Sequence, residues 1–519
     1  MEIDEALPPS PPHAQQRFEV LQERLVPLWE SIHDLNQDPQ TIVVIPSITL
    51  DTLEGTAVEM QPYEERYLFL LLLLRQPRAR LIYVTSQPIL PSVIDYYLDL
   101  MPGVIPSHAR PRLFTVPVLD GTRRPLSIKL LERPRMIERI RELIPDATRA
   151  HLVPYNTTEL ERDLAVRLGI PMYGADPRHF ALGTKTGSRR IFEEEGVCHP
   201  LGVENLFTLD DVVDAVIDMR RKKPSVSNVI VKLNEGVSGE GNAFVDLGTV
   251  TDGDDNAERV ALRAAVEAMQ FELEDASYPV YVDKLAERGG VVEERIQGDE
   301  FKSPSVQLRV TPLGDVELLS THDQLLGGQS GQTYLGCVFP ANPEYAATIT
   351  REAAKVGHRL AHEGVIGRFA IDFVTVKNDT GDWETYAIEI NLRKGGTTHP
   401  FLTLQFLTDG TYDADTATFT APSGKRKYFV ASDRVESPAY RGLTPDDLFD
   451  IVVRHCLHFD QSRQTGVVFH MLASLTEAGH CGLTAVGDSP EEAREIYERA
   501  ISVLDAEAAD ALTERPLPM

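Results

Sequence analysis

The stretch Ala387-Ile-Glu-Ile-Asn-Leu-Arg-Lys-Gly-Gly396 places three polar functional groups at two-residue spacing inside an apolar run. Successive side chains of a strand point to opposite faces, so Glu389, Asn391 and Arg393 share one face. A partly buried carboxylate is costly unless a cation satisfies it. Mg²⁺ typically takes one or two protein carboxylates and leaves its other positions to phosphate and water. The stretch therefore indicates a strand that binds a metal ion and phosphate groups, with a solvated surface strand as the alternative.

The bulk composition limits the class of protein. A chain of 519 residues is too long for one hydrophobic core, and roughly 150 residues per domain predicts three or four units. The net charge of -28 repels nucleic acid and anionic membranes, so we expect neither partner. The four cysteines, Cys198, Cys337, Cys456 and Cys481, are widely scattered. They predict reduced thiols in a cytoplasmic protein rather than a disulfide framework.

Neither the start of the chain nor its most apolar run predicts a membrane segment. Residues 1–14 include an acidic, proline-rich stretch without the basic and apolar regions of a signal peptide, so we expect a flexible tail. Residues 67–74 are apolar but far shorter than the roughly 20 residues that cross a bilayer. They predict a buried core helix.

Three patterns follow one another along the chain. Residues 15–180 alternate short apolar strands with helical patterns, which predicts a parallel, doubly wound α/β domain. Residues 181–435 change to helices, strands and hairpins with glycines, as in an α+β unit, and residues 440–519 predict a small α/β domain. The expected strands are 41–45, 80–85, 113–116, 151–154 and 171–174 in the first unit, 229–232, 243–246, 291–296, 306–310, 316–319, 369–374 and 384–390 in the second, and 466–472 in the third, which also has expected helices at 445–457 and 490–504.

Two lysines precede glycine-containing segments. Lys232 ends an apolar strand and is followed by Asn234-Glu-Gly-Val-Ser-Gly-Glu-Gly-Asn242. A lysine there is a fixed point charge, and glycines let backbone amides approach an anion closely. Lys185 lies at the expected start of a helix, where anions are stabilised. Both patterns favour phosphate binding; the alternatives are a plain hairpin turn and a solvated surface lysine.

Two further segments contribute carboxylates. The stretch Val291-Val-Glu-Glu-Arg-Ile-Gln-Gly-Asp-Glu300 combines an apolar strand, a carboxylate cluster and a glycine turn. Asp372 lies between Ile371 and Phe373, which predicts a second inward carboxylate. A structural aspartate with satisfied hydrogen bonds is the alternative.

The order of these features resembles the ATP-grasp superfamily across residues 185–400. The resemblance implies an ATP-grasp fold that clamps ATP between two sheets, preceded by a doubly wound pre-ATP-grasp domain and followed by a small α/β C-terminal domain. It implies phosphate-binding Lys185 and Lys232, a closing loop with Gly236, Ser238, Gly239 and Gly241, an adenine site at Glu293, Glu294 and Ile296, a ribose carboxylate Glu300, metal ligands Asp372, Glu389 and Asn391 for Mg²⁺ or Mn²⁺, and catalytic Arg393, Arg309 and Lys232.

One departure affects the catalytic arginine. D-alanine:D-alanine ligases carry an arginine two residues before the first acidic metal ligand, and here that position is Ala370. Transition-state stabilisation would then fall to Arg393 or Arg368. More closely, residues 321–332, 391–400 and 465–470 are similar to pheganomycin-type peptide ligases.

The resemblance implies an ATP-dependent carboxylate-amine ligase that forms an amide through an acylphosphate and releases ADP and phosphate, in peptide or secondary-metabolite biosynthesis. Its partners would be small carboxylates and amines, namely amino acids or peptides. The oligomeric state is left open, with a homodimer as one alternative. The other readings are a non-catalytic ATP-binding regulator and an ATP-grasp enzyme with a non-amine acceptor.

Substrate contacts and zinc binding are weaker expectations. Candidates for substrate contacts are Arg309, His322, Asp323 and residues 397–399, with a structural role favoured for His399. A zinc site would draw on His455, Cys456, His458, His470, His480 and Cys481. Their spacing fits no standard zinc pattern, so core or surface roles are favoured.

Overall fold

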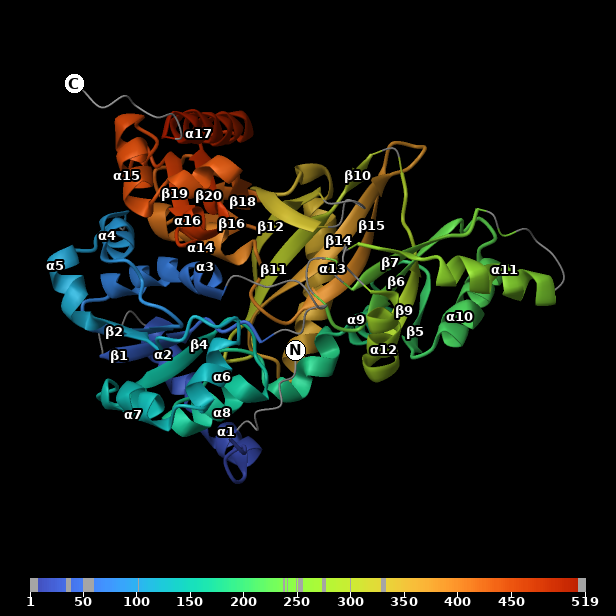
Figure 1. Ribbon diagram of the computed structural model, residues 1–519, viewed down its shortest axis with the longest axis horizontal. Coiled ribbons are helices and arrows are strands. Elements are labelled where there is room, and N and C mark those ends of the chain that lie inside the picture. Colours follow the sequence, from blue (N-terminus) through green and yellow to red (C-terminus); the bar gives the residue numbers. More distant parts are fainter. Residues whose placement is uncertain are drawn as a thin grey trace, which may run out of the picture.

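The computed structural model describes residues 8–33, 39–49, 60–100, 102–236, 239, 241–248, 250, 255–272, 277–298, 300–327 and 333–511. The first domain and the C-terminal segment are stacked at one end of an elongated molecule, and a small lobe projects at the other (Figure 1). The largest sheet runs between them. Of the predicted tail, residues 1–7 lie outside the described residues, and Ser10 hydrogen-bonds Asp163 (2.5 Å).

The first domain is built on a four-stranded parallel sheet of order β3-β2-β1-β4. Its strands are β1 Gln40–Ile45, β2 Ala79–Thr85, β3 Leu113–Pro117 and β4 Ala150–Pro154. These confirm four of the five expected strands, and their continuous apolar runs are typical of strands covered on both faces. The fifth, 171–174, is wrong: only Met172 bridges Leu152. Pro171 lacks an N–H to donate, which limits pairing there.

Helices cover both faces of this sheet. They are α1 Ala14–Gln22, α2 Leu25–His33, α3 Met60–Glu65, η1 Leu68–Arg75, α4 Pro91–Leu100, α5 Pro106–Ala109, η2 Arg110–Arg112, α6 Leu126–Leu131, α7 Pro134–Glu142, η3 Ala147–Arg149 and α8 Glu159–Leu168. The apolar run expected as a core helix is the buried 3₁₀ helix η1. An all-apolar run has no polar face, so its pattern cannot distinguish three from 3.6 residues per turn.

The small lobe has an antiparallel five-stranded sheet of order β5-β9-β6-β7-β8. Its strands are β5 Gly202–Leu206, β6 Asn228–Leu233, β7 Asn242–Asp246, β8 Gln270–Phe271 and β9 Gly290–Glu294. The helices α10 Leu209–Lys222, α11 Asp255–Glu267 and α12 Tyr278–Arg288 belong to this lobe, and η4 Pro177–Gly183 and α9 Lys185–Glu194 precede it. The lobe has its own apolar core.

The largest sheet has nine strands. They are β10 Phe301–Lys302, β11 Pro304–Val310, β12 Val316–Gly327, β13 Thr333–Phe339, β14 Gly367–Lys377, β15 Trp383–Asn391, β18 Tyr428–Glu436, β19 Gly466–His470 and β20 His480–Gly487. The helices α13 Pro343–His362 and α14 Thr398–Thr408 pack on it, and β16 Thr411–Asp413 pairs with β17 Thr418–Thr420. All seven strands expected in the second unit are confirmed, with shifted ends.

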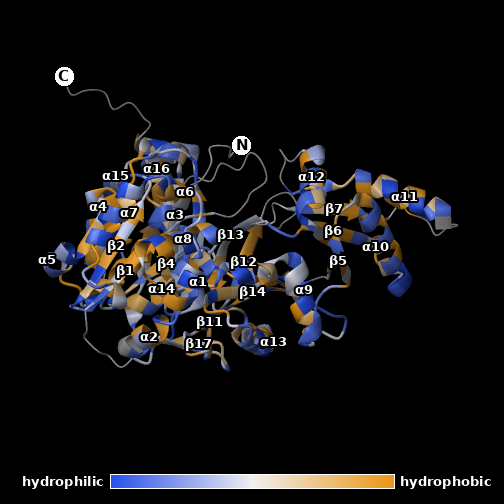
Figure 2. Ribbon diagram, turned by 90° about the horizontal axis from the view of Figure 1, so that it is seen from below, coloured by the Kyte–Doolittle hydropathy of each residue, from blue (hydrophilic) through white to orange (hydrophobic). Residues whose placement is uncertain are grey.

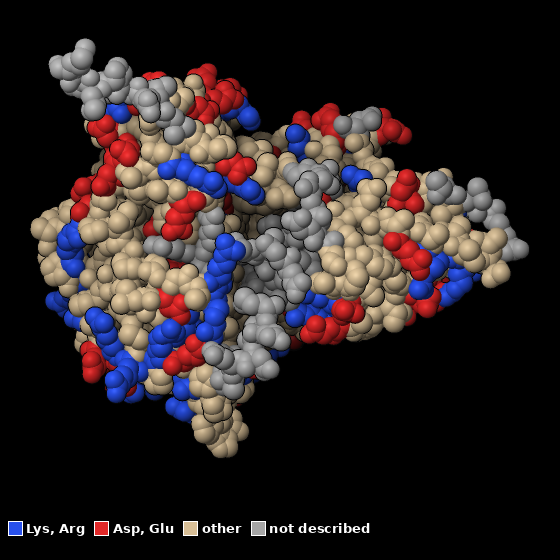
Figure 3. Space-filling model, in the orientation of Figure 1, with Lys and Arg blue, Asp and Glu red and all other residues tan. Residues whose placement is uncertain are grey.

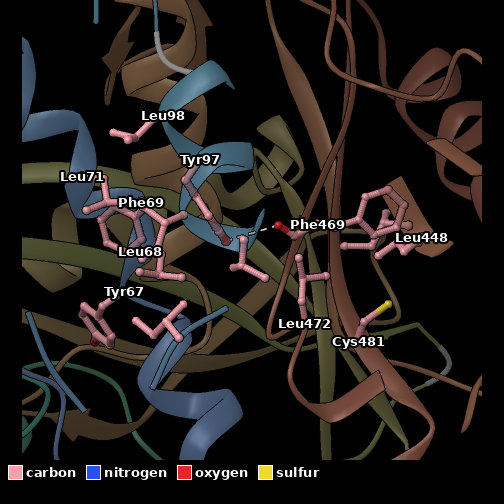
Figure 4. Packing of buried hydrophobic residues seen from close by; sticks show 14 of the residues in the cluster. Tyr67, Leu68, Phe69, Leu71, Tyr97, Leu98, Leu448, Phe469, Leu472 and Cys481 are labelled. Carbon is pink, nitrogen blue, oxygen red and sulfur yellow. Dashed lines mark hydrogen bonds between the residues drawn. The ribbon is translucent and has the colours of Figure 1, made fainter. Parts of the chain in front are cut away.

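The C-terminal segment continues the largest sheet, since β20 pairs with both β18 and β19. Its helices are η5 Pro438–Gly442, α15 Pro445–Arg454, α16 Ser474–Ala478 and α17 Pro490–Ala511. Its apolar core is shared with the first domain: Tyr97 donates to the Phe469 carbonyl (3.2 Å) beside Leu68, Leu472 and Cys481 (Figure 4). The domain boundaries themselves stay a prediction.

Hydropathy and charge follow this layering. The strands β1 and β2 are largely apolar, whereas the outer helices alternate apolar and polar faces (Figure 2). On the face drawn in Figure 3, acidic and basic side chains are interspersed over both ends of the molecule. Among the described helices, none is long and apolar enough to span a membrane.

Candidate active site

The adjacent strands β14 and β15 bring the predicted metal ligands together. Asp372 lies opposite Glu389 across the two strands, and Asn391 follows on the same face. The Asn391 amide Nδ2 donates to Asp372 Oδ2 (2.9 Å) and to Glu389 Oε1 (3.1 Å). Like charges directly opposite each other destabilise a sheet. The two carboxylates therefore require donors or a cation between them.

Lys185 supplies a cation from helix α9. It is the first residue of the helix, which Thr184 caps by accepting a hydrogen bond from the Gly187 N–H (3.0 Å). Asn234, at the start of the glycine loop, accepts from the backbone of Lys185 (3.1 Å). The Lys185 ammonium forms an ion pair with Glu389. This confirms that Lys185 lies at a helix N-terminus and places it beside the acidic strands.

The acid and base at this site have shifted pKa values. Burial, together with the nearby cations Lys232 and Arg393, lowers the pKa of Lys185 to about 7. Burial raises the pKa of Asp372 above its ordinary value, although hydrogen bonds and nearby cations oppose the change. Both charged forms are therefore disfavoured, which is expected of a buried site that lacks part of its counter-charge.

Lys232 lies on β6 in a closed ionic network. Its Nζ is 2.5 Å from Glu293 Oε2, and Arg189 Nη1 is 2.9 Å from Glu293 Oε1. All three side chains are buried. Burial would raise the pKa of Glu293, but the two cations hold it below its ordinary value. The network fixes the position of the Lys232 ammonium and fully engages the Glu293 carboxylate.

A cavity of about 260 Å³ lies between the first domain and the acidic strands. The predicted residues that line it are Lys185, Gly236, Glu389, Asn391 and Arg393. Other residues of its wall include Thr49, Asn156, Asp176, Phe180, Asn234 and Arg288. The structure thus assembles these five predicted phosphate and metal positions around one space, whereas Lys232 and Asp372 are not part of its lining.

Thr49 and Asn156 were not predicted from the sequence. They follow β1 and β4, and the Thr49 N–H donates to Asn156 Oδ1 (3.1 Å). These strands flank the point where the sheet order reverses, and ligands of doubly wound sheets bind outside the strand carboxyl ends at such a point. The alternation of strands and helices was therefore a usable signal, although the strand order was needed to apply it.

The predicted adenine and ribose positions lie at the end of β9 and on the segment after it. The Glu294 N–H donates to the Leu201 carbonyl (2.8 Å). Among the described residues, no acceptor pairs with the backbone N–H of Ile296. Glu300 is exposed, and its Oε1 lies 3.2 Å from Lys377 Nζ. Ser238 of the predicted loop lies outside the described residues, and these nucleotide contacts stay predictions.

Three predicted side chains make their contacts away from the cavity wall. Arg309 pairs with Glu317 and stacks on Trp29 (4.8 Å to the ring centroid). His322 is fully buried among aromatic rings, with no hydrogen-bond partner for either ring nitrogen among the described residues. Asp323 accepts from the Tyr345 hydroxyl (2.7 Å). The structure does not bring these three to the cavity.

The turn that starts α14 holds another polar cluster. Thr397 accepts from Gln307, and Thr398 accepts from the Gly395 N–H. His399 Nε2 lies 2.9 Å from His470 Nε2 and 3.2 Å from Asp433 Oδ1.

Asp433 makes this cluster ionic, because its other oxygen pairs with Arg66 (2.6 Å). Of the six residues considered for zinc, His470 belongs to the group of described residues whose ligand atoms converge, with His399 and Asp433. The Arg66 guanidinium already balances the carboxylate. An ion pair flanked by two histidines therefore accounts for the group, with Arg66 Nε and His399 Nδ1 left without a hydrogen-bond partner among the described residues.

Two family models match the chain. Residues 179–267 and 263–415 match the model described as IQCH-like, ATP-grasp. Residues 447–500 match the model described as PGM1 C-terminal domain.

Known proteins with similar sequence or fold agree with these matches. The L-propargylglycine--L-glutamate ligase of Streptantibioticus cattleyicolor is 28% identical over 447 residues, covering 85% of this chain and 88% of that protein. IQ motif-containing protein H of Danio rerio is 22% identical over 84% of this chain, which spans 45% of that protein. The biotin carboxylase of Campylobacter jejuni, solved as a β,γ-ATP complex, shares the fold with a TM-score of 0.52 and 12% identity over 92% of this chain and 96% of that one. Residues 179–415 of this chain are therefore an ATP-grasp domain.

Proposed function

We propose that this chain is an ATP-dependent ligase that joins the carboxylate of one amino acid or peptide to the amine of another. The observation that carries the proposal is the cavity in which Lys185, Glu389, Asn391 and Arg393 meet the carboxyl-end edge of the first domain's sheet. One side of this space offers cations and acidic metal positions. The other side offers polar groups of a second domain, which suits an enzyme that must hold a nucleotide beside its substrates.

The residues present fit Mg²⁺ and the phosphates of ATP. The Asn391 amide bridges the facing carboxylates Asp372 and Glu389, and the Lys185 ammonium pairs with Glu389, so these carboxylates would be the residues to hold a divalent cation. When bound, Mg²⁺ would neutralise the charge that develops during phosphoryl transfer. The Asn391 amide can turn its oxygen toward the ion, because oxygen and nitrogen of an amide are interchangeable by rotation.

The proposed reaction has two steps. An oxygen of the substrate carboxylate attacks the γ-phosphorus of ATP, the bond between this phosphorus and the β,γ-bridging oxygen breaks, and ADP is released. The acylphosphate stays bound. The amine nitrogen then attacks the acyl carbon, phosphate leaves with the bonding electrons, and the ammonium protons pass to solvent. Lys185, Lys232 and Arg393 would hold the phosphates and the acyl oxygen through charge-assisted contacts.

The relative from Streptantibioticus cattleyicolor guides the substrate class. Its name describes the ligation of two amino acids, and it aligns over most of both chains. We therefore expect two amino acids or short peptides as substrates here. L-glutamate is the first acid to test.

The test is a condensation screen with purified full-length protein, ATP and Mg²⁺. Each standard amino acid is offered as the amine with L-glutamate and then with every other amino acid as the acid, and products are scored by mass. The expected result is a condensation product formed with one equivalent of ADP. Hydroxylamine is added in parallel, because it traps an acylphosphate as a hydroxamate even when the natural amine is missing.

Other outcomes would overturn the proposal. ATP binding without ADP, hydroxamate or product across the whole screen would favour a non-catalytic ATP-binding protein. A thioester or carboxylated product would retain the acylphosphate and replace the amine.

A further inference from the structure

Two cations near the cavity, buried Lys394 and half-buried Arg368, form no ion pair with an acidic side chain among the described residues. Lys394 is 8% exposed, and its Nζ donates to the Pro154 carbonyl (2.5 Å). Arg368 has a buried Nη1 without a hydrogen-bond partner among the described residues. Neither side chain forms an ion pair within the described part of the chain. Buried charges are normally paired, because removing a charge from water without a counter-charge is costly.

Neighbouring cations add to the positive charge around Lys394 and Arg368. Arg368 lies directly opposite Arg309 across β14 and β11, and Arg393 immediately precedes Lys394. Burial, together with Arg368, lowers the pKa of Lys394 to about 7. Burial, together with Arg309, lowers the pKa of Arg368 to about 10. Such shifts are expected where positive charges gather in a low-dielectric interior, and Glu317 opposes the shift of the Arg368 pKa only in part.

Other buried lysines of the chain show how a closed site looks. Lys427 is fully buried, and its Nζ contacts Asp488 Oδ1 (2.5 Å) and two backbone carbonyls at 2.9 Å. Lys232 has Glu293 in the same role. Lys394 has a single carbonyl instead.

The position of these cations connects them to the cavity. Lys394 follows Arg393, and its acceptor Pro154 lies two residues before Asn156; Arg393 and Asn156 both line the cavity. The ring of buried Tyr67 packs against Lys394 (5.9 Å).

We propose that Lys394 and Arg368, with Arg393 at the cavity wall, bind a carboxylate that the ligation leaves unreacted, namely the free carboxylate of the amino acid or peptide that supplies the amine. The planar guanidinium fork matches a carboxylate in two-point geometry, and the ammonium adds a point charge. This inference rests on the proposed ligase function.

The spacing along β14 separates this carboxylate from the one that is phosphorylated. Arg368 is four residues from Asp372, which corresponds to about 13 Å along a strand. An anion held at Arg368 is therefore not the group at the metal position. The phosphates of ATP have their own predicted cations in Lys185 and Lys232, so with an acid that has one carboxylate, the carboxylate of the amine substrate is the remaining anion of the proposed reaction.

The experiment compares an amino acid acceptor with its carboxamide. The acceptor found in the condensation screen and its carboxamide are each offered with the same acid, ATP and Mg²⁺. The wild type should prefer the free carboxylate by at least about tenfold in kcat/KM. In Lys394→Met and Arg368→Gln this preference should fall below about threefold. Lys394→Arg keeps the charge and should restore much of it.

Hydroxylamine and a surface variant provide the controls. Hydroxylamine carries no carboxylate, so hydroxamate formation by Lys394→Met should stay within about threefold of wild type. Lys355→Gln removes one exposed charge on α13, where Lys355 pairs with Glu352, and should change nothing.

Three results would overturn the inference. The wild type could use the carboxamide as well as the acid. Lys394→Met could lose hydroxamate formation as strongly as acceptor ligation while remaining folded, which would place Lys394 in acylphosphate chemistry. Wild-type protein that forms neither hydroxamate nor product would instead refute the proposed function itself, and the inference with it.

Discussion

The two lysine–glutamate pairs Lys232–Glu293 and Lys185–Glu389 have the same composition and different surroundings. In the small lobe, Lys232 and Arg189 share Glu293, and the three buried side chains form a closed network. At the acidic strands, Lys185 pairs with Glu389 on the wall of the cavity, and burial lowers its pKa to about 7. The first pair has all its charge partners within the protein. The second is stabilised by partners that a metal ion and phosphates can replace.

The difference separates structural from ligand-binding charge. A closed network holds a cation in place, so its loss should be felt as lost stability. Loss of an open pair, in which a ligand can displace one partner, should mainly reduce ligand binding and catalysis. The same residue types therefore predict different phenotypes, according to whether the cavity lies beside them.

The largest expected effect is on turnover at the open pair. Glu389→Ala removes a predicted metal ligand, so ADP release should fall by at least about 10³-fold. The protein should remain folded, because the substitution also removes one of two facing carboxylates. ADP release in the presence of both substrates is the measurement. Glu384→Gln, an exposed position on the same strand, is the matched control.

Full turnover of Glu389→Ala would refute the metal assignment. Equal loss in Glu384→Gln would show that the strand, and not the ligand, is at fault. Lys232→Ala removes a predicted phosphate contact and should also reduce ADP release, but unlike Glu389→Ala it should lower the free energy of unfolding as well, because it opens the closed network.

The closed network should respond in stability instead. Glu293→Gln leaves Lys232 and Arg189 without their shared carboxylate in a buried site. Removing one partner of a buried ionic group typically costs about 3–5 kcal/mol. We expect a loss of this size in the free energy of unfolding by chemical denaturation, and a smaller change for Glu389→Gln. Equal losses in the two variants would erase the distinction between closed and open pairs.

The sequence predicted the lysines and acidic strands of this comparison because their spacing is local. Glu389, Asn391 and Arg393 alternate along one strand, and Lys185 follows a recognisable helix start. The partners of these residues could not be read in the same way. Glu293 meets Arg189 only because β9 pairs with β6 beside α9, and Arg309 meets Glu317 across a hairpin.

The same limit applies to the fold. Long strands with alternating or continuous apolar patterns were predicted, whereas β13, β18 and β20 were not. The strand β18 joins β13 to β20, which are far apart in the chain, so no local repeat marks it. Residues 171–174 have the composition of a strand, but Pro171 has no N–H to donate and the Gly174 N–H bonds the nearby Met172 carbonyl.

A third prediction uses pH to compare an unpaired lysine with these pairs. The folded-state pKa of Lys394 is about 7, below the unfolded value of roughly 10.4. Between these values the unfolded chain binds more protons, so the free energy of unfolding should rise as pH increases from about 7 toward 10. Lys394→Met should flatten this rise by up to about 1.4 kcal/mol per pH unit. Denaturant unfolding at pH 6, 8 and 9.5 measures it, and an unchanged slope would show that Lys394 is not a buried, uncompensated cation.

The smallest expected effect is the uptake of a proton by Lys185 when MgATP binds. Phosphates beside Lys185 would favour its charged form, so MgATP binding at pH 8 should raise its pKa from about 7 and take up between about half and one proton. Calorimetric titration in buffers of different ionisation enthalpy measures the uptake. Lys185→Met should remove it, whereas Lys355→Gln should preserve it because Lys355 is exposed and paired outside the cavity. Proton uptake that persists in Lys185→Met would assign the proton to another group. The protonation of Lys185 would then not depend on the ligand, and the contrast with Lys232 would be lost.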